Sequence, residues 1–208
     1  MAEQSSREQI MTTTFDSNTH PSDGHLRVAR ATHDEVIRIH DLGTTKISAD
    51  IATLDTFHRI HRRNADALWG VYANDGALVG FFAFLMLTAD GVDRLVSGEL
   101  NTRAPDISAI VATGQAPQAV YVWALVAEKK IAGALPLVLS AFDAAVYART
   151  DLYARPATDG GYRLMSKIGF RAIDGGEIEQ GELCVIRRSL TPTQIRYPGR
   201  AATSHAFL

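Results

Sequence analysis

Cysteine is nearly absent from this chain, and so are long apolar runs. The single cysteine, Cys184, has no partner for an internal disulfide, which is typical of a protein in a reducing compartment. The longest apolar run, residues 78–87, contains a glycine and is about half as long as a membrane-spanning helix. Residues 1–24 are polar and lack the apolar centre of a secretory signal. We therefore expect a cytoplasmic protein without a membrane partner.

Neither sign of charge is in large excess. The 208 residues include 21 Lys and Arg against 23 Asp and Glu, a formal net charge of −2, which argues against nucleic-acid binding through bulk positive charge. With 46% hydrophobic residues, the chain can bury the core of one medium-sized domain. No internal repeat is visible. We predict a flexible N-terminal tail over residues 1–24, a folded domain over 25–190 and a C-terminal tail over 191–208.

Two helices are expected after a short first strand. Residues 26–31 alternate as a strand does, and Thr32 and Glu35 then have the spacing of a capping box, in which each side chain satisfies a free amide at a helix start. This helix should end just before Gly43. Apolar residues at near-helical spacing between positions 47 and 60 predict a second, amphipathic helix.

A hairpin is the clearest local feature of the sequence. Residues 68–73 form one apolar run, residues 77–87 form another, and Asn74-Asp75-Gly76 lies between them. An Asp-Gly pair between two apolar runs supplies the positive φ angles of hairpin turns. The second run is apolar on both faces, so we expect it in the centre of the sheet.

The middle of the chain contains one segment without a clear pattern. Residues 88–119 mix Gly, Pro, Asp and Thr, with a short helix indicated near 107–111. So long an irregular stretch is typical of a functional loop or of a misread element. A strand at 120–126 follows, and a turn leads from it into an amphipathic helix. The apolar stripe of that helix consists of Leu135, Leu139, Phe142 and Val146.

Another strand and helix are predicted in the C-terminal third. A short strand is expected at 151–154, and a helix should end at Ile168, with Thr158 or Asp159 as its N-cap. Gly169 suits the left-handed position after this helix, and the apolar residue that follows can fold back onto the last turn.

With a last strand at 182–189, the element order becomes βααβββαβαβ, a mixed sheet with helices on its faces. This order resembles that of the GNAT N-acetyltransferase superfamily, and two motifs strengthen the resemblance. One is the strand–turn–helix at 120–146, and the other is the segment 161–170, Gly-Tyr-Arg-Leu-Met-Ser-Lys-Ile-Gly-Phe, which is similar to the penultimate helix of the family. The resemblance implies an α/β (α+β) fold with a mixed, mostly antiparallel central sheet, helices on both faces, and splayed fourth and fifth strands.

The turn after residue 126 is the predicted cofactor site. A strand that leads through a short turn into a helix presents unpaired backbone amides at the positive end of the helix dipole, where a pyrophosphate fits. In the family this loop holds the pyrophosphate of coenzyme A, and the pantetheine arm lies between the splayed strands. The alternative is a simple turn whose Gly133 only closes the bend. The resemblance implies acetyl-CoA as the acyl donor, bound by Leu125, Val126, Ala127, Lys130, Ile131, Ala132, Gly133, Ala134, Leu135 and Thr158.

Two residues are candidates for the catalytic acid and base. The family's usual proton donor is a tyrosine four residues before the Gly-Phe pair, and the residue at that position here is Met165, which cannot donate a proton. Tyr162, one turn earlier, is the candidate acid, and packing of its ring against the sheet is the alternative. Glu99 is the candidate base, and a solvated loop carboxylate is the alternative. Thr158 can likewise be a plain N-cap.

The sequence offers no convincing set of metal ligands. His58 and His61 lie three residues apart on a predicted helix, but no carboxylate or cysteine is placed to complete a site. A solvated basic face is the favoured interpretation of these histidines. Cys184 lies in an apolar strand and is interpreted as a small core residue.

The favoured function is therefore an N-acetyltransferase that transfers an acetyl or other acyl group from acetyl-CoA to an amine of a small molecule or protein, without a metal. An acyl-CoA-binding sensor or assembly domain with little catalytic activity is the alternative, because Met165 replaces the tyrosine. A doubly wound nucleotide-binding protein is disfavoured, because no Gly-x-Gly-x-x-Gly follows the first strand. The resemblance leaves a homodimer open.

Overall fold

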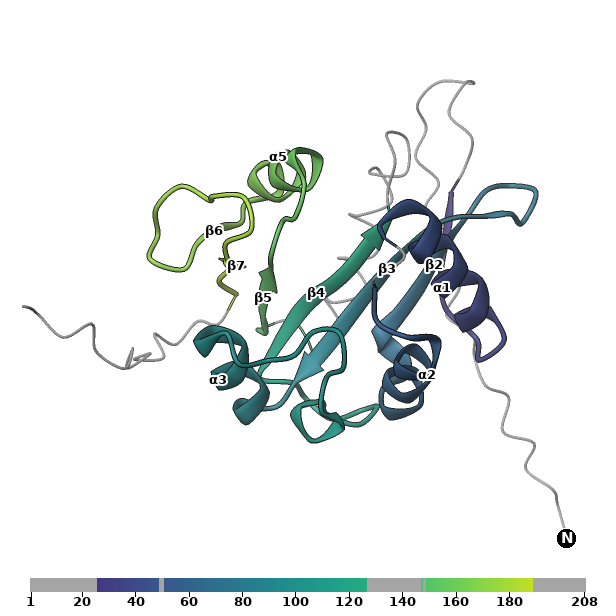
Figure 1. Cartoon of the computed structure of the whole chain (residues 1–208), viewed down its shortest axis with the longest axis horizontal. Coiled ribbons are helices and arrows are strands. Elements are labelled where there is room, and N and C mark those ends of the chain that lie inside the picture. Colours follow the sequence, from purple (N-terminus) through teal and green to yellow (C-terminus); the bar gives the residue numbers. More distant parts are fainter. Residues whose placement is uncertain (1–25, 49–50, 127–146, 148, 189–208) are drawn as a thin grey trace, which may run out of the picture.

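The computed structural model describes residues 26–48, 51–126, 147 and 149–188. A seven-stranded sheet forms the centre of this part of the chain (Figure 1). In chain order the elements are β1 (Arg27–Arg30), α1 (Glu35–Lys46), α2 (Leu54–Arg63), the 3-10 helix η1 (Ala65–Ala67), β2 (Leu68–Tyr72), β3 (Leu78–Leu87), α3 (Ala89–Ser97), the 3-10 helix η2 (Ile107–Ala109), β4 (Ala119–Val126), β5 (Asp151–Ala154), α5 (Asp159–Ile168), β6 (Arg171–Ala172) and β7 (Cys184–Ile186).

The strands lie in the order β1-β2-β3-β4-β5-β7-β6. Every neighbouring pair is antiparallel except β4 and β5, which run parallel. The predicted mixed, mostly antiparallel sheet is therefore confirmed. Strand β3 lies between β2 and β4, and its last eight residues are buried, as expected from a run that is apolar on both faces.

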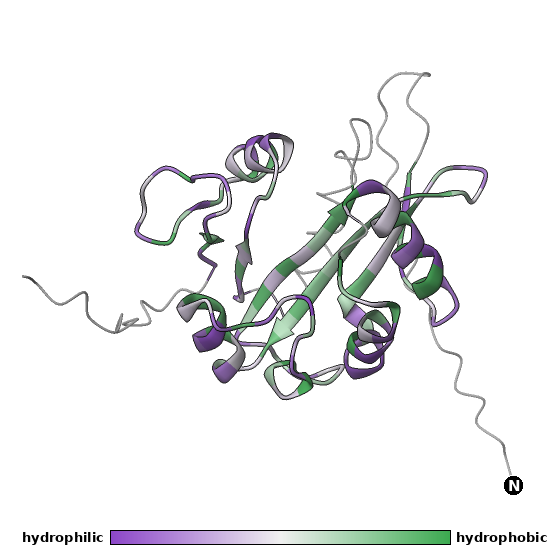
Figure 2. Cartoon of the chain, in the orientation of Figure 1, coloured by the Kyte–Doolittle hydropathy of each residue, from purple (hydrophilic) through white to green (hydrophobic). Residues whose placement is uncertain are grey.

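The two faces of the sheet carry separate hydrophobic cores, because successive side chains of a strand point to opposite faces. The core under α1, α2 and α3 includes Ile39, Phe57, Ile60, Phe81, Ala83, Leu85, Leu95 and Tyr121. The core on the opposite face, against α5, includes Phe82, Phe84, Met86, Val120, Leu152, Met165 and Phe170. In Figure 2 the central strands are mostly hydrophobic, whereas the helices carry hydrophilic residues on their outer sides.

Helix α1 is longer than predicted, because Gly43 does not end it. Gly43 is buried within the helix, and a Cβ at this position would lie 2.9 Å from Ile51 Cδ1 and 3.2 Å from Phe81 Cζ. The missing side chain lets α1 approach β3 closely, and the helix continues to Lys46. Close packing, and not helix termination, explains this glycine.

The start of α1 contains only half of the predicted capping box. The Glu35 carboxylate accepts hydrogen bonds from the Thr32 backbone amide at 2.8 Å and from the Thr32 hydroxyl at 3.0 Å. The Thr32 hydroxyl therefore donates to Glu35 instead of accepting from a helix amide. Glu35 also accepts a hydrogen bond from the Tyr72 hydroxyl at 2.5 Å, which ties the helix start to β2.

Four other elements differ from the prediction. Helix α2 begins later than predicted, because the Thr53 hydroxyl caps it by accepting a hydrogen bond from the Thr56 amide at 3.2 Å. The unassigned segment contains α3, which its mixed composition concealed, and η2 near the predicted short helix. Strand β6 had no predicted counterpart, and β7 is shorter than the strand predicted at 182–189.

The predicted hairpin, the strand β5 and the helix α5 are confirmed. Strands β2 and β3 are joined by a turn in which Gly76 has a φ of 81°. Strand β5 has the predicted bounds. Helix α5 ends at Gly169, whose φ is 101°, and the Phe170 amide donates to the Met165 carbonyl at 3.0 Å while the Phe170 side chain packs back into the core.

The predicted tails, and the amphipathic helix after the turn at residue 127, lie outside the described residues. Within the described ranges, no helix is both long enough and apolar enough to cross a membrane. The division into one domain with two tails, and the cytoplasmic location, stay predictions.

Candidate active site

Strands β4 and β5 separate part of the way along their length. β5 pairs with the first four residues of β4, and the last pair joins Val122 to Ala154, whereas β4 continues to Val126. In the described part of the chain, no strand pairs with residues 123–126 on the side that faces β5. The two strands lie side by side where β5 begins and diverge toward their carboxyl ends (Figure 1). We call residues 123–126 the fork edge.

A β-bulge lies at the start of the fork edge. The register of β4 against β3 shifts between residues 83 and 84 of β3, and Trp123 is the extra residue of β4. Bulges re-aim side chains, and here the Trp123 ring lies 4.6 Å from the Phe57 ring of α2. The Trp123 indole N–H donates to the Thr102 carbonyl at 2.6 Å. Trp123 therefore connects the fork edge to α2 and to the loop after α3.

The fork edge can pair with an extended ligand. An unpaired strand edge presents backbone N–H and C=O groups that require hydrogen-bond partners. Of the predicted cofactor residues, Leu125 and Val126 lie on this edge, where Leu125 is half-buried and Val126 is buried. A chain that contains amides can bind such an edge as an added strand. The other predicted residues of the turn, 127 and 130–135, lie outside the described residues.

Thr158 is the N-cap of α5. Its hydroxyl accepts a hydrogen bond from the Gly161 amide at 3.1 Å, which confirms the capping interpretation. The Thr158 side chain is exposed, so the cap does not bury it away from a ligand. Its contact with the cofactor stays a prediction.

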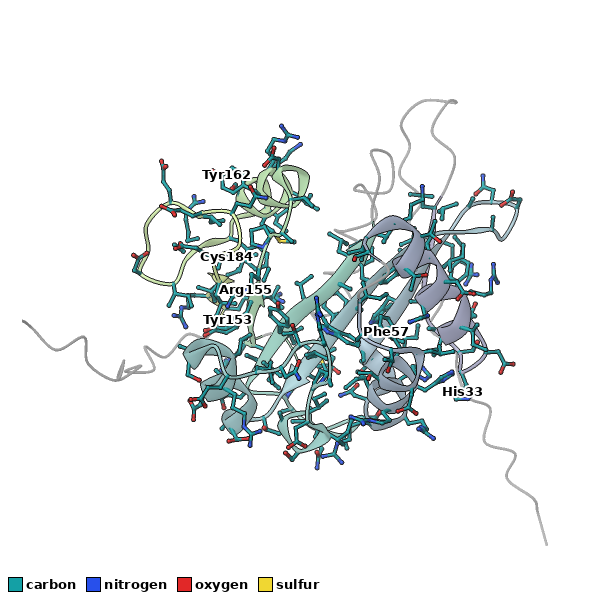
Figure 3. All side chains as sticks on the ribbon, in the orientation of Figure 1. His33, Phe57, Tyr153, Arg155, Tyr162 and Cys184 are labelled. Carbon is teal, nitrogen blue, oxygen red and sulfur yellow. The ribbon has the colours of Figure 1, made fainter. Side chains whose placement is uncertain are left out.

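Helix α5 directs Met165 into the core. The Met165 side chain is 5% exposed and packs beside Phe170 on the α5 face of the sheet. Tyr162, the candidate acid, is half-buried on the same helix and packs against the same core, as the packing alternative proposed. Figure 3 shows Tyr162 on α5, apart from Tyr153 and Arg155. Its role as proton donor stays a prediction.

Glu99, the candidate base, lies directly after α3. The helix ends at Gly98, whose φ is 81°, and the Glu99 amide donates to the Arg94 carbonyl at 2.8 Å. The Glu99 side chain is exposed. This residue belongs to the loop in which Thr102 accepts the indole hydrogen bond of Trp123, so its loop is tied to the fork edge.

Two residues that the sequence did not single out meet where the fork opens. Tyr121 pairs with Tyr153 one position before the last pair of β4 and β5, and Arg155 follows the end of β5. Burial raises the pKa of Tyr121, and the nearby Arg155 guanidinium offsets part of this rise through its charge and its hydrogen bonding. The Tyr121 hydroxyl therefore stays protonated at neutral pH and is able to donate a hydrogen bond.

Cys184 is a core residue, as predicted. It is fully buried on β7, and its thiol donates to the Ala154 carbonyl at 3.3 Å. Burial raises the pKa of the thiol to about 11, so the reactive thiolate is disfavoured. Figure 3 shows Cys184 near Arg155, the residue that follows β5.

A cleft of about 360 Å³ opens beside Arg155, between the end of β5 and the β6–β7 hairpin. The Arg155 guanidinium donates to the Gly181 carbonyl of this hairpin at 2.8 Å. Because the same guanidinium acts on Tyr121, it connects the cleft to the fork. The cleft is lined by Arg155, Ala172, Ile173, Asp174, Gly181, Glu182 and Leu183.

The histidines of α2 are half-buried and contact residues near the end of β1. The ring of His58 lies 4.5 Å from the ring of His33, and His61 Nε2 lies 2.9 Å from the Ala31 carbonyl oxygen. Burial lowers the pKa of His58, and the positive charges of His33 and Arg62 lower it further. Among the described residues, no group of three or more His, Cys, Asp or Glu is arranged to hold a metal ion. The expected independence from metal stays a prediction.

No protein-family model and no curated protein matches the sequence. Several solved structures resemble it. A Corynebacterium glutamicum protein described as "histone acetyltransferase HPA2 and related acetyltransferase" is 17% identical, over 80% of this chain and 97% of that chain, with a TM-score of 0.46. A GNAT-family acetyltransferase from Staphylococcus aureus Mu50 is 11% identical, over 79% and 99%, with a TM-score of 0.49. The GphF GNAT-like decarboxylase, in complex with isobutyryl-CoA, is 14% identical, over 75% and 80%, with a TM-score of 0.49.

These similarities concern the fold. Identities and TM-scores are low in all three cases, so none of these structures carries an argument about the function of this chain. Among the described residues, the mixed, mostly antiparallel sheet and the divergence of β4 and β5 agree with the arrangement that the sequence resemblance implies.

Proposed function

We propose that the protein is an N-acetyltransferase, which transfers an acetyl or other acyl group from acetyl-CoA to an amine. The fork edge is the observation that carries this proposal, because it leaves a strand end open inside a sheet of GNAT-like order. A pantetheine arm is extended and contains two amides, so it can supply hydrogen bonds to the edge at Leu125 and Val126. The acyl thioester would then lie near Tyr121.

The pyrophosphate of the cofactor is proposed to bind at the turn that follows β4, through Ala127, the segment 130–135 and Thr158. Gly133→Asp adds a carboxylate that repels a pyrophosphate, so we expect this variant to lose acetyl-CoA binding in calorimetry while its unfolding curve is kept. Gly76→Asp is the matched control, because a Cβ at Gly76 meets no atom within 4 Å and aspartate tolerates its φ of 81° better than most residues. Unchanged acetyl-CoA binding in Gly133→Asp would contradict the assignment.

The proposed reaction joins an amine to the thioester carbonyl. The neutral nitrogen attacks the carbonyl carbon, the C–N bond forms, the C–S bond breaks, and a nitrogen proton ends on the departing sulfur, which yields an amide and free coenzyme A. A lysine-like ammonium has a pKa of about 10.4, so its deprotonation at pH 7 costs about 4–5 kcal/mol. Glu99 is the proposed base for this step.

Two tyrosines are candidates for the proton donor to the sulfur. Tyr162 is the candidate from the sequence, and Tyr121 is the second, because its protonated hydroxyl lies where the strands diverge. Replacing the true donor by phenylalanine should lower kcat about 10²–10⁴-fold and leave the affinity for acetyl-CoA nearly unchanged. An unaltered kcat in both variants would remove both residues from the mechanism.

Thiol release from acetyl-CoA in the presence of different amines tests the activity directly. We expect release that requires both the protein and a particular class of amine. The second candidate function, an acyl-CoA-binding sensor, is favoured by one observation: a buried methionine occupies the position of the family's tyrosine. Binding of acetyl-CoA in calorimetry without thiol release across the amines would support the sensor and contradict the enzyme.

A further inference from the structure

The cleft beside the fork carries both signs of charge. Three of its seven lining residues are charged, with Arg155 at the end of β5 and both Asp174 and Glu182 in the β6–β7 hairpin. Three apolar residues, Ala172, Ile173 and Leu183, also line it. A ligand that satisfies such a site needs an anionic group, a cationic group and a small apolar part.

Arg155 is held in position and keeps hydrogen-bond donors for a ligand. One of its terminal nitrogens donates to the Gly181 carbonyl at 2.8 Å, and the guanidinium also faces the Tyr121 hydroxyl. A guanidinium has five N–H donors, so these contacts leave enough of them for a carboxylate. Arginine binds carboxylates through paired, charge-assisted hydrogen bonds.

The β6–β7 hairpin offers acceptors for an ammonium group. Asp174 Oδ1 accepts a hydrogen bond from the Gly176 amide at 3.0 Å, which fixes the carboxylate within the hairpin. Glu182 is exposed and lines the same cleft. An ammonium group donates three hydrogen bonds, and charge-assisted bonds to carboxylates are about twice as strong as neutral ones.

We infer that this cleft binds the amine acceptor as a zwitterion, which makes the acceptor a small α-amino acid. Its carboxylate binds Arg155, its ammonium group faces Asp174 and Glu182, and its side chain lies against the apolar residues of the cleft. This is the state before the reaction, and the ammonium group loses a proton before its nitrogen attacks the thioester. This inference deepens the proposed function, because it assigns the acceptor class of the same site. Arg155 contacts both the cleft and Tyr121, so it places the acceptor beside the fork.

Saturation-transfer NMR without acetyl-CoA tests this binding independently of acyl transfer. The probes are the standard L-amino acids and, for those that bind, the matching decarboxylated amine and deaminated acid; for L-leucine these are isoamylamine and 4-methylpentanoate. At least one amino acid should bind, and its two partial analogues should bind about tenfold or more weakly. An amino acid that binds no better than its amine analogue would overturn the inference, as would the absence of binding at millimolar concentrations.

Two charge-removing variants should show opposite signatures. Arg155→Gln, which keeps a donor for Gly181, should weaken binding of the amino acid and the deaminated acid about tenfold but leave the amine analogue unchanged. Asp174→Asn should weaken the amino acid and the amine but leave the acid unchanged. Arg163→Gln is the control, because this arginine is exposed on α5 and does not line the cleft. Identical profiles in wild type and both cleft variants would overturn the inference.

Failure of the inference and failure of the proposed function give different results. Thiol release with simple amines that lack a carboxylate, and without any preference for amino acids, would uphold the acetyltransferase and refute the zwitterion site. Amino-acid binding with the expected variant profile, but without thiol release, would uphold the site and contradict the acetyltransferase.

Discussion

Replacing Trp123 by phenylalanine tests how the fork edge is held. Trp123 is the bulged residue of β4; its ring packs against Phe57, and its indole N–H donates to the Thr102 carbonyl at 2.6 Å. Phenylalanine keeps an aromatic ring beside Phe57 but has no donor. The variant therefore loses only the contact that fixes the loop after α3 to β4.

The expected loss follows from the exposure of the two partners. A neutral hydrogen bond contributes about 0.5–1.5 kcal/mol net, and Thr102 is half-buried, so water can replace the indole as a donor. We expect the free energy of unfolding to fall by about 1 kcal/mol, or the Tm by about 2–4 °C for a chain of this length. Trp123→Ala also removes the ring, and because Trp123 is only half-buried we expect a loss of about 3 kcal/mol, the lower limit for buried aromatics.

Urea unfolding measures the stability, and hydrogen exchange measures the loop. In Trp123→Phe the amides of residues 99–105 should exchange faster than in the wild type. Trp69→Phe is the matched control, because the Trp69 indole donates to the Asp66 carbonyl at 2.8 Å on another part of the sheet. It should lose stability without a change in the loop. Unaltered stability and unaltered loop exchange in Trp123→Phe would refute the role given to this hydrogen bond.

Three further predictions concern packing and titration. Gly91→Ala should destabilise the protein by about 1–3 kcal/mol in urea unfolding, because a Cβ would lie 2.4 Å from the Ala109 backbone oxygen. Gly160→Ala, whose Cβ would find no atom closer than 3.9 Å, should be neutral or stabilising, and a similar loss in both variants would contradict the packing argument. Glu35→Gln should lower the stability at neutral pH. Partial burial raises the pKa of Glu35, but hydrogen bonds and nearby positive charge have a larger combined effect, so the pKa of Glu35 in the folded protein is lowered. The stabilisation by the ionised Glu35 is fully present above the pKa of Glu35 in the unfolded chain, and it is lost as the pH falls through the lower pKa of the folded state. The free energies of unfolding of wild type and variant should therefore converge in acid. A constant difference between them would contradict this role of Glu35. His58→Gln should reduce the loss of stability on acidification. Burial and neighbouring positive charges lower the pKa of His58 in the folded protein, so protonation below pH 6.5 favours unfolding. An unchanged slope of the free energy of unfolding against pH in this variant would refute the prediction.

The sequence predicted elements whose limits depend on one or two local residues. Gly76 and Gly169 both adopt the positive φ that their turns require, and Thr158 caps the helix for which it was proposed. Backbone conformation at such positions follows from the residue type itself. The hairpin, β5 and α5 could therefore be placed within a residue or two.

Features that depend on distant contacts were not predictable in this way. Gly43 was interpreted as a helix end, but the structure uses it for close packing against Phe81, which lies on a strand far along the chain. Helix α3 was concealed because it is only nine residues long and its neighbours are rich in turn-forming residues. Tertiary packing outweighs local propensity in both cases.

The candidate site was predictable only in part for the same reason. The splayed strands followed from the resemblance, and Met165 followed from its position before Gly169 and Phe170. Tyr121 and Arg155 are 34 residues apart, and only the parallel register of β4 and β5 brings them together. The charged cleft depends on the β6–β7 hairpin, whose first strand is two residues long and has too little pattern to be recognised.

Hydrogen exchange at the fork edge, with and without acetyl-CoA, tests the central claim most directly. If the pantetheine arm pairs with β4 at this edge, saturating acetyl-CoA should slow exchange at those backbone amides of residues 123–126 that point toward the open edge, and it should leave the amides of β1 and β2 unchanged. Identical exchange at residues 123–126 in both samples would contradict the account.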